Sequence, residues 1–219
     1  MIEVKELHKS YGTTEVLKGV NGRISKGDFI TIVGASGAGK STLLHLVAGL
    51  DSYNSGSISF DGMSLGNLSK KELNDYRNNH VGLVFQFHNL LPELTALENI
   101  TLPRWISGQM DDSAERKATE LLQLLGIEHR AHHLPNEMSG GEQQRVAIAR
   151  AVANAPRILL ADEPTGNLDP ETANDVFGHL KTIVHGTQTA ALIVTHNQQL
   201  AQQMDRVLTI EDGQIRELA

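Results

Sequence analysis

A glycine-rich segment between an apolar run and a helical pattern most limits how this chain of 219 residues can fold. The run Phe29–Val33 is short, apolar and β-branched, which indicates a buried strand. Gly34-Ala-Ser-Gly-Ala-Gly-Lys-Ser41 follows it, and apolar residues then recur at helical spacing. Strand, glycine loop and helix in this order are the context that the pattern G-x-x-x-x-G-K-S/T requires. We therefore expect a loop that wraps a phosphate chain.

The residue types in this loop predict a nucleotide triphosphate and Mg²⁺ as its ligands. Glycines let the backbone turn its N–H groups inward, and the helix start adds a positive dipole. In this pattern the lysine reaches the β- and γ-phosphates and the following hydroxyl binds Mg²⁺. The predicted nucleotide contacts here are Gly34, Ala35, Ser36, Gly37, Ala38, Gly39, Lys40, Ser41 and Thr42.

A second glycine-rich segment, Met138-Ser-Gly-Gly-Glu142, precedes another helical run. One triphosphate needs a single glycine cradle, and neither a lysine nor an acid pair accompanies this second segment. We therefore interpret Ser139, Gly140, Gly141 and Glu142 as a lid for the nucleotide of a second copy. This interpretation predicts a homodimer.

Composition excludes several classes of function. The net charge of −7 argues against broad electrostatic binding to nucleic acid. The chain has no cysteine, so it has neither a disulfide framework nor a thiolate site. No apolar run approaches the length of a membrane-spanning helix, and the N-terminus does not resemble a signal segment. Any role at a membrane would therefore depend on a partner.

Alternating strands and helices predict an α/β fold with a mixed or parallel sheet. The nucleotide-binding core is expected at 1–87 and 155–219, and an inserted helical subdomain at 88–154, all within one domain of 1–219. The expected strands are Ile2–Leu7, Val16–Ile24, Phe29–Val33, Ser57–Phe60, Val81–Phe85, Ile158–Ala161, Ala190–Val194 and Val207–Ile210. The expected helices include 114–125, 140–153, 171–184 and 198–204.

Polar residues at the ends of three predicted strands suggest the chemistry of the site. Asp162 and Glu163 follow a buried apolar run, and the carboxyl ends of parallel strands are where open α/β sheets bind ligands. Asp162 suits Mg²⁺, and Glu163 could polarise an attacking water. His196 could donate to the γ-phosphate, and the amide of Gln86 could contact both metal and water.

Together these segments resemble an ABC-type ATPase subunit, and the resemblance covers essentially the whole chain. The glycine loop resembles the family's Walker A motif, Gln86 its Q-loop, Ser139-Gly-Gly141 its signature and Ile158–Asp162 its Walker B motif. The resemblance also implies that Glu163 is the general base, that His196 is the switch histidine, that Asp169 belongs to the D-loop, and that Tyr11 stacks on adenine. It implies a P-loop NTPase core with an antiparallel β-subdomain near the N-terminus.

The signature differs from the family's common L-S-G-G-Q at two positions. Met138 replaces leucine and is expected to pack below the loop, whereas Glu142 replaces glutamine and brings an acid near the expected triphosphate. Ser139 and Gly141 keep the hydroxyl and N–H donors expected to meet the γ-phosphate. ATP affinity or turnover could therefore differ from the common form.

Two further segments bear on the branch of the family. The stretch 162–169 resembles the group of ATPases that serves lipoprotein release, macrolide-type efflux and cell-division complexes. Within that group, 86–99 resembles the ATPases of lipoprotein-releasing systems, whereas Gln143-Gln144-Arg145 is closer to macrolide-type efflux ATPases. The resemblance favours lipoprotein release, with efflux or a cell-division complex as alternatives. It implies integral membrane permease subunits of the LolC/LolE-like or MacB-like group as partners. The expected location is peripheral, on the cytoplasmic face of the inner membrane.

Two weaker signals have ordinary structural explanations as well. His129, His132 and His133 could suggest a metal, but a solvated turn before Pro135 accounts for them. The apolar side chains of 87–97 pack against the sheet in part, and the rest are expected to form a groove for a helix of a membrane partner.

Overall fold

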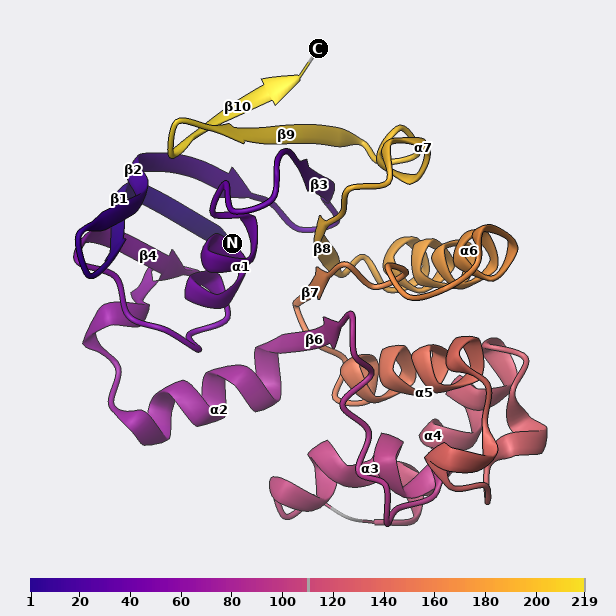
Figure 1. Cartoon of the computed structure of the whole chain (residues 1–219). Coiled ribbons are helices and arrows are strands. Elements are labelled where there is room, and N and C mark those ends of the chain that lie inside the picture. The colour runs from indigo at the N-terminus through magenta and orange to yellow at the C-terminus, as the bar shows by residue number, and fades with distance from the viewer. Residues whose placement is uncertain (110, 219) are drawn as a thin grey trace.

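The computed structural model describes residues 1–109 and 111–218, and it contains two β-sheets with helices packed against them (Figure 1). The smaller sheet is antiparallel, with the strand order β2-β1-β4-β5. Its strands are β1 (Ile2–Tyr11), β2 (Thr14–Ile24), β4 (Ser55–Phe60) and β5 (Met63–Ser64). The predicted antiparallel β-region near the N-terminus is thereby confirmed.

The larger sheet carries the strand ends at which the candidate site lies. Its order is β10-β9-β3-β8-β7-β6, and all pairs are parallel except β10 with β9. The strands are β3 (Phe29–Val33), β6 (Val81–Phe85), β7 (Ile158–Asp162), β8 (Ala190–Val194), β9 (Arg206–Glu211) and β10 (Gln214–Leu218). The central strands β3, β7 and β8 are almost wholly buried because packed elements cover both of their faces.

Helices begin where the sequence supplies capping residues. Helices α2, α3 and α5 each start with a capping box, formed at Ser69, Thr95 and Ser139. The α-helices are α1 (Lys40–Val47), α2 (Lys70–His80), α3 (Ala96–Ile106), α4 (Asp112–Leu124), α5 (Gly140–Val152), α6 (Pro170–Thr187) and α7 (Gln198–Ala201). Three short 3₁₀ helices are η1 (Leu65–Asn67), η2 (Glu128–Arg130) and η3 (Pro135–Glu137).

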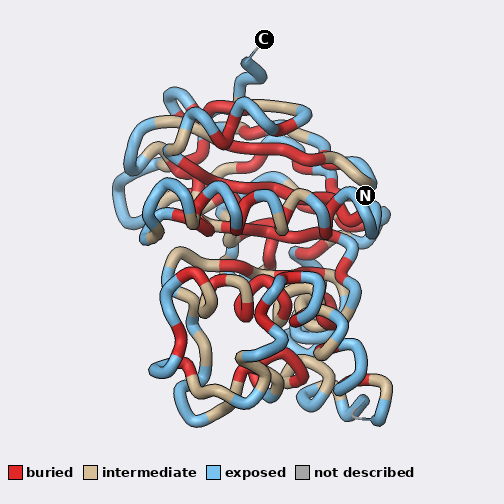
Figure 2. The backbone as a smooth tube through the Cα atoms, turned by 90° about the vertical axis from the view of Figure 1, so that its right-hand side faces the viewer, coloured by how far each residue is buried: buried red, intermediate tan, exposed pale blue. Residues whose placement is uncertain are grey.

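Two hydrophobic cores lie on opposite faces of the larger sheet. One contains Ile32 of β3 with Leu7 of β1 and Leu44 of α1, so it joins the two sheets. The other contains Leu159 of β7 together with Leu180 of α6. Figure 2 shows the buried segments concentrated along the strands and on the inner sides of the helices. Burial from both sides holds the carboxyl ends of the parallel strands in fixed positions.

The helices α3, α4 and α5 lie together at one end of the molecule (Figure 1). Their buried residues Ile100, Leu122 and Val146 belong to the same core as Val84 and Leu159 of the sheet. The helical region therefore shares its core with the sheet. The bounds 88–154 stay a prediction.

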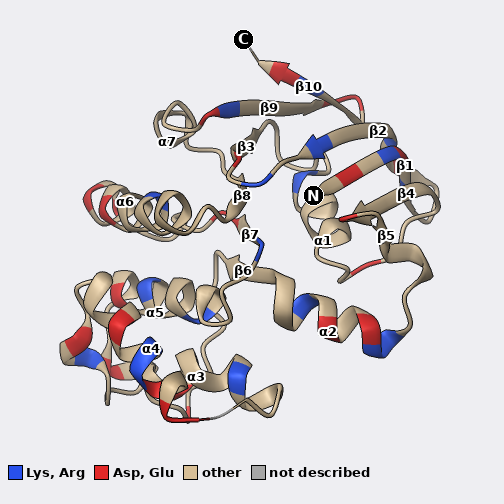
Figure 3. Cartoon of the chain, turned by 180° about the vertical axis from the view of Figure 1, so that it is seen from behind, with Lys and Arg blue, Asp and Glu red and all other residues tan. Residues whose placement is uncertain are grey.

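Figure 3 shows acidic and basic residues together on α2 and α4. Within the described ranges, no helix is both long and apolar enough to cross a membrane.

Candidate active site

A cavity of about 510 Å³ lies at the carboxyl ends of β3, β6, β7 and β8. It gathers most of the residues that the sequence predicts for the first glycine loop and the strand ends. Its lining residues are Tyr11, Val16, Gly34, Ser36, Gly37, Gly39, Lys40, Ser41, Thr42, Gln86, Asp162, Glu163, Val194 and His196. Ala35 and Ala38 belong to the same loop. The parallel register explains the assembly, because it aligns Asp162 with Val194 at the same edge.

The glycine loop is closed around the ammonium group of its own lysine. Lys40 is 9% exposed, and its Nζ donates to the carbonyl oxygens of Gly34 at 2.9 Å and Ala35 at 2.8 Å. Gly39 has a φ of 100°, and a Cβ there would lie 2.9 Å from Cγ1 of Val16, so a side chain does not fit. A bound triphosphate would offer Lys40 oxygen acceptors that carry full charge.

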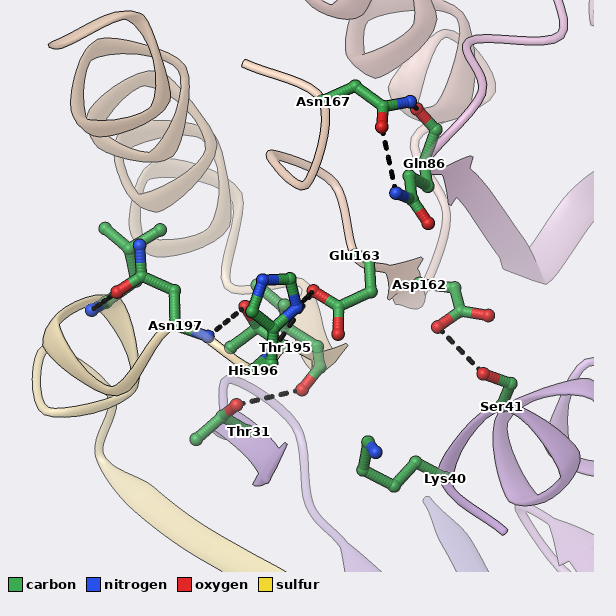
Figure 4. A network of polar contacts seen from close by, with 12 residues as sticks. Thr31, Lys40, Ser41, Gln86, Asp162, Glu163, Asn167, Thr195, His196 and Asn197 are labelled. Atoms are coloured by element: carbon green, nitrogen blue, oxygen red, sulfur yellow. Dashed lines mark hydrogen bonds and ion pairs between the residues drawn. The ribbon is translucent and has the colours of Figure 1, made fainter. Parts of the chain in front are cut away.

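Three oxygen-bearing side chains could hold a hard cation beside this loop. Ser41 Oγ donates to Asp162 Oδ1 at 3.0 Å, so the hydroxyl and the carboxylate already meet (Figure 4). Gln86 also lines the cavity, but its Nε2 donates to Asn167 Oδ1 at 2.9 Å. Asn167 Nδ2 donates in turn to the backbone oxygen of Gln86 at 3.1 Å. This pair of bonds joins the loop after β6 to the loop after β7 and leaves the Gln86 amide oxygen available.

Glu163 and His196 form an acid–imidazole pair at the cavity. His196 Nδ1 lies 2.9 Å from Glu163 Oε2, and the backbone N–H of His196 donates to the same oxygen at 3.3 Å (Figure 4). The Glu163 side chain is mostly buried, whereas that of His196 is exposed. Glu163 has a φ of 48°, which is strained for a residue with a side chain. The two contacts from His196 hold its carboxylate at a defined place beside the strand end.

Tyr11 lies at another edge of the cavity, in contact with Lys9 and Asp51. No role was predicted from the sequence for either of these two residues. The Tyr11 hydroxyl donates to Asp51 Oδ2 at 2.7 Å, and Nζ of Lys9 lies 4.6 Å from the Tyr11 ring centroid. Lys9 also pairs with Asp51 at 2.9 Å. The hydrogen bond from Lys9 lowers the pKa of Asp51, and burial raises the pKa of the Tyr11 phenol. The spacing of Lys9 and Tyr11, two residues apart on one strand, could have indicated that they lie on the same face. Their shared partner Asp51 is far along the chain and could not have been predicted in this way.

The second glycine-rich segment lies apart from this cavity. Among the described residues, none of 139–142 lines it. Ser139 is the N-cap of α5, and its hydroxyl accepts from the backbone N–H of Glu142 at 3.3 Å. Met138 is buried in the core, as expected for a residue that packs below the loop. Asp169 caps α6 by accepting from the N–H groups of Glu171 and Thr172.

Glu142, the acid that departs from the common signature, is paired within the chain. Its Oε1 lies 2.8 Å from Nε of Arg130, and its Oε2 accepts from the backbone N–H of Ser139 at 2.7 Å. Burial raises the pKa of Glu142, but the bonds from Arg130 and Ser139 more than offset this effect and lower the pKa to about 2. The stretch 129–131 and the acid at Glu142 both resemble lipoprotein-releasing ATPases, but no functional role was predicted for Arg130 itself.

The sequence of residues 17–166, which contains the glycine loop, the strand-end acid pair and the signature segment, matches one family model, described as ABC transporter. The chain belongs to the ABC transporter family. Within that family it is an ATP-binding subunit, the class of subunit that hydrolyses ATP. The predicted family and the predicted class of enzyme are confirmed.

Curated relatives in this family cover nearly the full chain. The lipoprotein-releasing system ATP-binding protein LolD of Paramagnetospirillum magneticum is 51% identical over 204 residues, which are 93% of this chain and 90% of the relative. LolD of Geobacter metallireducens is 48% identical, with 98% and 97% covered. The prediction of a resemblance to lipoprotein-releasing ATPases is thereby confirmed.

Solved structures confirm the predicted fold class. The dimeric structure of MJ0796, a bacterial ABC transporter cassette, superposes with a TM-score of 0.90 at 40% identity, covering 100% of this chain and 98% of that one. A dimeric post-hydrolysis state of the same cassette bound to ADP and Pi gives a TM-score of 0.90 at 39% identity. An ABC cassette of this fold therefore forms dimers and binds nucleotide.

Proposed function

We propose that this chain is the ATP-hydrolysing subunit of an ABC transporter that powers release of lipoproteins from the inner membrane. One observation carries the proposal. LolD relatives match 93–98% of the chain at 48–51% identity. The likeness is therefore not confined to the nucleotide-binding motifs. The geometry of the cavity supports the ATPase part of the proposal independently.

The cavity would hold ATP by its phosphates and its base. Lys40 would exchange its bonds to Gly34 and Ala35 for phosphate oxygens, and the N–H groups of the loop and of α1 would surround the remaining oxygens. The ring of Tyr11 would stack on adenine at the other edge. The hydroxyl of Ser41, the carboxylate of Asp162 and the amide oxygen of Gln86 are hard donors that fit Mg²⁺. Bound Mg²⁺ would neutralise charge that develops on the phosphates.

Glu163 and His196 would carry out the proton handling. The Glu163 carboxylate would accept a proton from the attacking water, and its contacts with His196 would hold it in place. His196 bonds Glu163 through Nδ1, so its Nε2 is left to face the γ-phosphate. The contact between Glu163 and His196 would thus orient both side chains before the nucleotide arrives.

A second copy of the chain would complete the site. Ser139, Gly140, Gly141 and Glu142 lie outside the cavity of their own chain, at the start of α5. In a head-to-tail homodimer the hydroxyl of Ser139 and the N–H groups of this helix start would meet the partner's γ-phosphate. Asp169 in the D-loop would lie at the same interface. The dimeric state of the similar cassette supports this arrangement.

The membrane partner would dock between the sheet and the helical region. A groove of about 450 Å³ is lined by residues of α2, β6, α3 and α5, including Phe85 and Ile106, and by Asn154 just after α5. The buried Oδ1 of Asn154 has no hydrogen-bond partner within the described part of the chain. Ile106, which lines the groove, is exposed, and so is its neighbour Trp105. A short helix of a permease subunit would cover them, and the chain would then be peripheral on the cytoplasmic face of the inner membrane.

A release assay tests the proposal. The tagged chain is purified from membranes with its permease subunits and placed in vesicles loaded with a lipoprotein, and transfer of the lipoprotein to a soluble acceptor is measured. ATP should drive release, and Glu163→Gln should abolish it. Ile106→Asp should lose the permease, whereas Leu124→Asp, at another exposed apolar position, should retain it. Release that does not require ATP, or permeases without a large periplasmic region, would contradict the lipoprotein role.

A further inference from the structure

The acid in the signature segment has both of its oxygens occupied. Glu142 Oε1 lies 2.8 Å from Nε of Arg130, and Oε2 accepts from the N–H of Ser139 at 2.7 Å. Nε2 of His129 lies 3.7 Å from Oε1. The Glu142 side chain is only 13% exposed, so it is directed into its own chain. Neither oxygen is left to turn toward a second molecule.

Arg130 is held in place by a short segment that packs against α3. It ends the 3₁₀ helix η2, and its N–H donates to the carbonyl oxygen of Ile127 at 2.9 Å. The adjacent Ala131 accepts at 2.9 Å from the N–H of Leu97, in the first turn of α3. These backbone contacts, which do not depend on Glu142, therefore place the Arg130 guanidinium beside α5.

The helix start needs this compensation in the dimer. An acid in the first turn stabilises an isolated helix by interacting with its dipole. A triphosphate brought to the same helix start would be repelled by an acid that lacks a counter-charge. Arg130 supplies the counter-charge and also holds the carboxylate beside the backbone of Ser139. The Ser139 hydroxyl and the N–H groups of the helix start are then left to face the nucleotide.

We propose that Arg130 is a positioning residue of the nucleotide site formed between two copies, which neutralises Glu142 and holds it back from the partner's triphosphate. The inference rests on the proposed function, since it requires the signature segment to face the ATP of a second chain. It makes the Arg130–Glu142 pair the feature through which this chain tolerates an acid in the signature.

If Arg130 acts through its charge, removing the charge of Glu142 should rescue an Arg130 variant; a purely structural role of Arg130 would not be rescued in this way. All variants are made with Glu163→Gln, which should hold the ATP-bound dimer together, and the ATP concentration for half-maximal dimer is measured by sedimentation. Arg130→Ala should raise that concentration by about tenfold or more, because an unpaired acid then opposes the triphosphate. Arg130→Lys should keep most of the effect of the native residue. Adding Glu142→Gln to Arg130→Ala should restore the value of Glu142→Gln alone, since the repelling charge is gone.

Two further measurements separate repulsion from misfolding. Raising NaCl from about 50 to about 500 mM should shrink the Arg130→Ala defect, because salt screens repulsion between charges. Arg116→Ala removes an exposed arginine of α4 and is the matched control, with no change expected. The melting temperature of each variant reports its folding.

The outcomes distinguish the inference from the function on which it rests. A parent Glu163→Gln chain that stays monomeric at saturating ATP overturns the shared site and the inference with it. A parent that dimerises while Arg130→Ala needs no more ATP overturns the inference alone. Failure of Glu142→Gln to rescue the folded Arg130→Ala chain overturns it as well.

Discussion

Single side chains decide how the cavity would hold a nucleotide base. Lys9 is 7% exposed and lies against the ring of Tyr11, while Asp51 binds both the lysine and the phenol. A cation on one face of an aromatic ring is attracted by its π-electrons, and it makes the ring electron-poor toward a base on the opposite face. Lys9 and Asp51 therefore set both the orientation and the electronic character of the Tyr11 ring, on which we propose that the base stacks.

Removing the charge of Lys9 should weaken binding of the base only. Lys9→Met keeps the length of the side chain but loses the contact with Tyr11 and the bond to Asp51. The dissociation constant for ATP should rise by about three- to tenfold, because base–aromatic stacking contributes about 1–3 kcal/mol and part of it would be lost on a ring without its cation. Titration calorimetry with tripolyphosphate should show no change, and Lys26→Met provides an exposed control. An equal loss for both ligands would count against this role of the Tyr11 ring.

At the residue scale, the sequence predicted the site residues that follow a strand or belong to the glycine loop. It did not predict pairs of residues, such as Lys9 and Asp51, that contact each other from different elements. Lys40, Asp162 and His196 could be expected at one cavity because parallel strands end at the same edge. The partnership of Lys9 with Asp51 depends on how β1 lies beside the segment after α1, and no local pattern encodes it. Their proposed roles stay predictions.

At the scale of elements, the start of the signature helix is also a packing contact. A Cβ on Gly141 would lie 2.4 Å from Cγ2 of Thr172, in the first turn of α6. Glycine at this position therefore lets α5 and α6 approach closely, apart from any contact with phosphate. The contact thereby ties the start of α5 to the first turn of α6, whose N-cap is Asp169.

Gly141→Ala should destabilise the fold through this contact. Overpacking of a tight contact costs about 1–3 kcal/mol in the free energy of unfolding. Thr172→Ser removes the methyl group and keeps the hydroxyl, so the double variant should regain most of the lost stability. Urea unfolding of the two single variants and the double variant measures the coupling. Strictly additive effects would show that the two helices do not meet at this point.

The pH dependence of stability should report the Glu142 pair. Its pKa is about 2 in the folded chain, against 4.5 ordinarily, so folding favours the ionised acid. The stabilisation is present above about pH 4.5 and is lost as the pH falls toward the folded pKa. Glu142→Gln should cost about 1–2 kcal/mol of unfolding free energy at pH 7. In urea titrations that difference should disappear as the pH falls toward 2.5, and a constant difference would contradict the assignment.

The sequence predicted the bounds of several strands of the larger sheet, although β7 extends one residue beyond its expected range, to Asp162. The strands Phe29–Val33, Val81–Phe85 and Ala190–Val194 match their predicted bounds, because apolar runs are interrupted where the sheet ends. The edge strand β10 was not expected, since most of its residues are exposed and leave no apolar run. Helix α3 was not expected as a separate element, and it contains Pro103 within its range.

At the scale of the whole molecule, the chain carries the two parts of the proposed nucleotide site, the cavity and the signature segment, at separate places. The cavity holds Lys40, Asp162 and Glu163, whereas Ser139 at the start of α5 lies outside it. A similar cassette is dimeric, and the chain superposes on it over its full length. Assembly would therefore be a step of the reaction. Nucleotide would join two copies, and hydrolysis would let them separate and move the membrane partner.

The mass of the Glu163→Gln chain in solution with and without ATP tests this claim most directly. The substitution should prevent hydrolysis while leaving the phosphate loop intact, so ATP should convert the 23.9 kDa chain into a dimer. Adding Ser139→Ala should weaken the dimer, since it removes a donor expected to meet the partner's phosphate. A Glu163→Gln chain that binds ATP and yet keeps the mass of one chain would contradict the account.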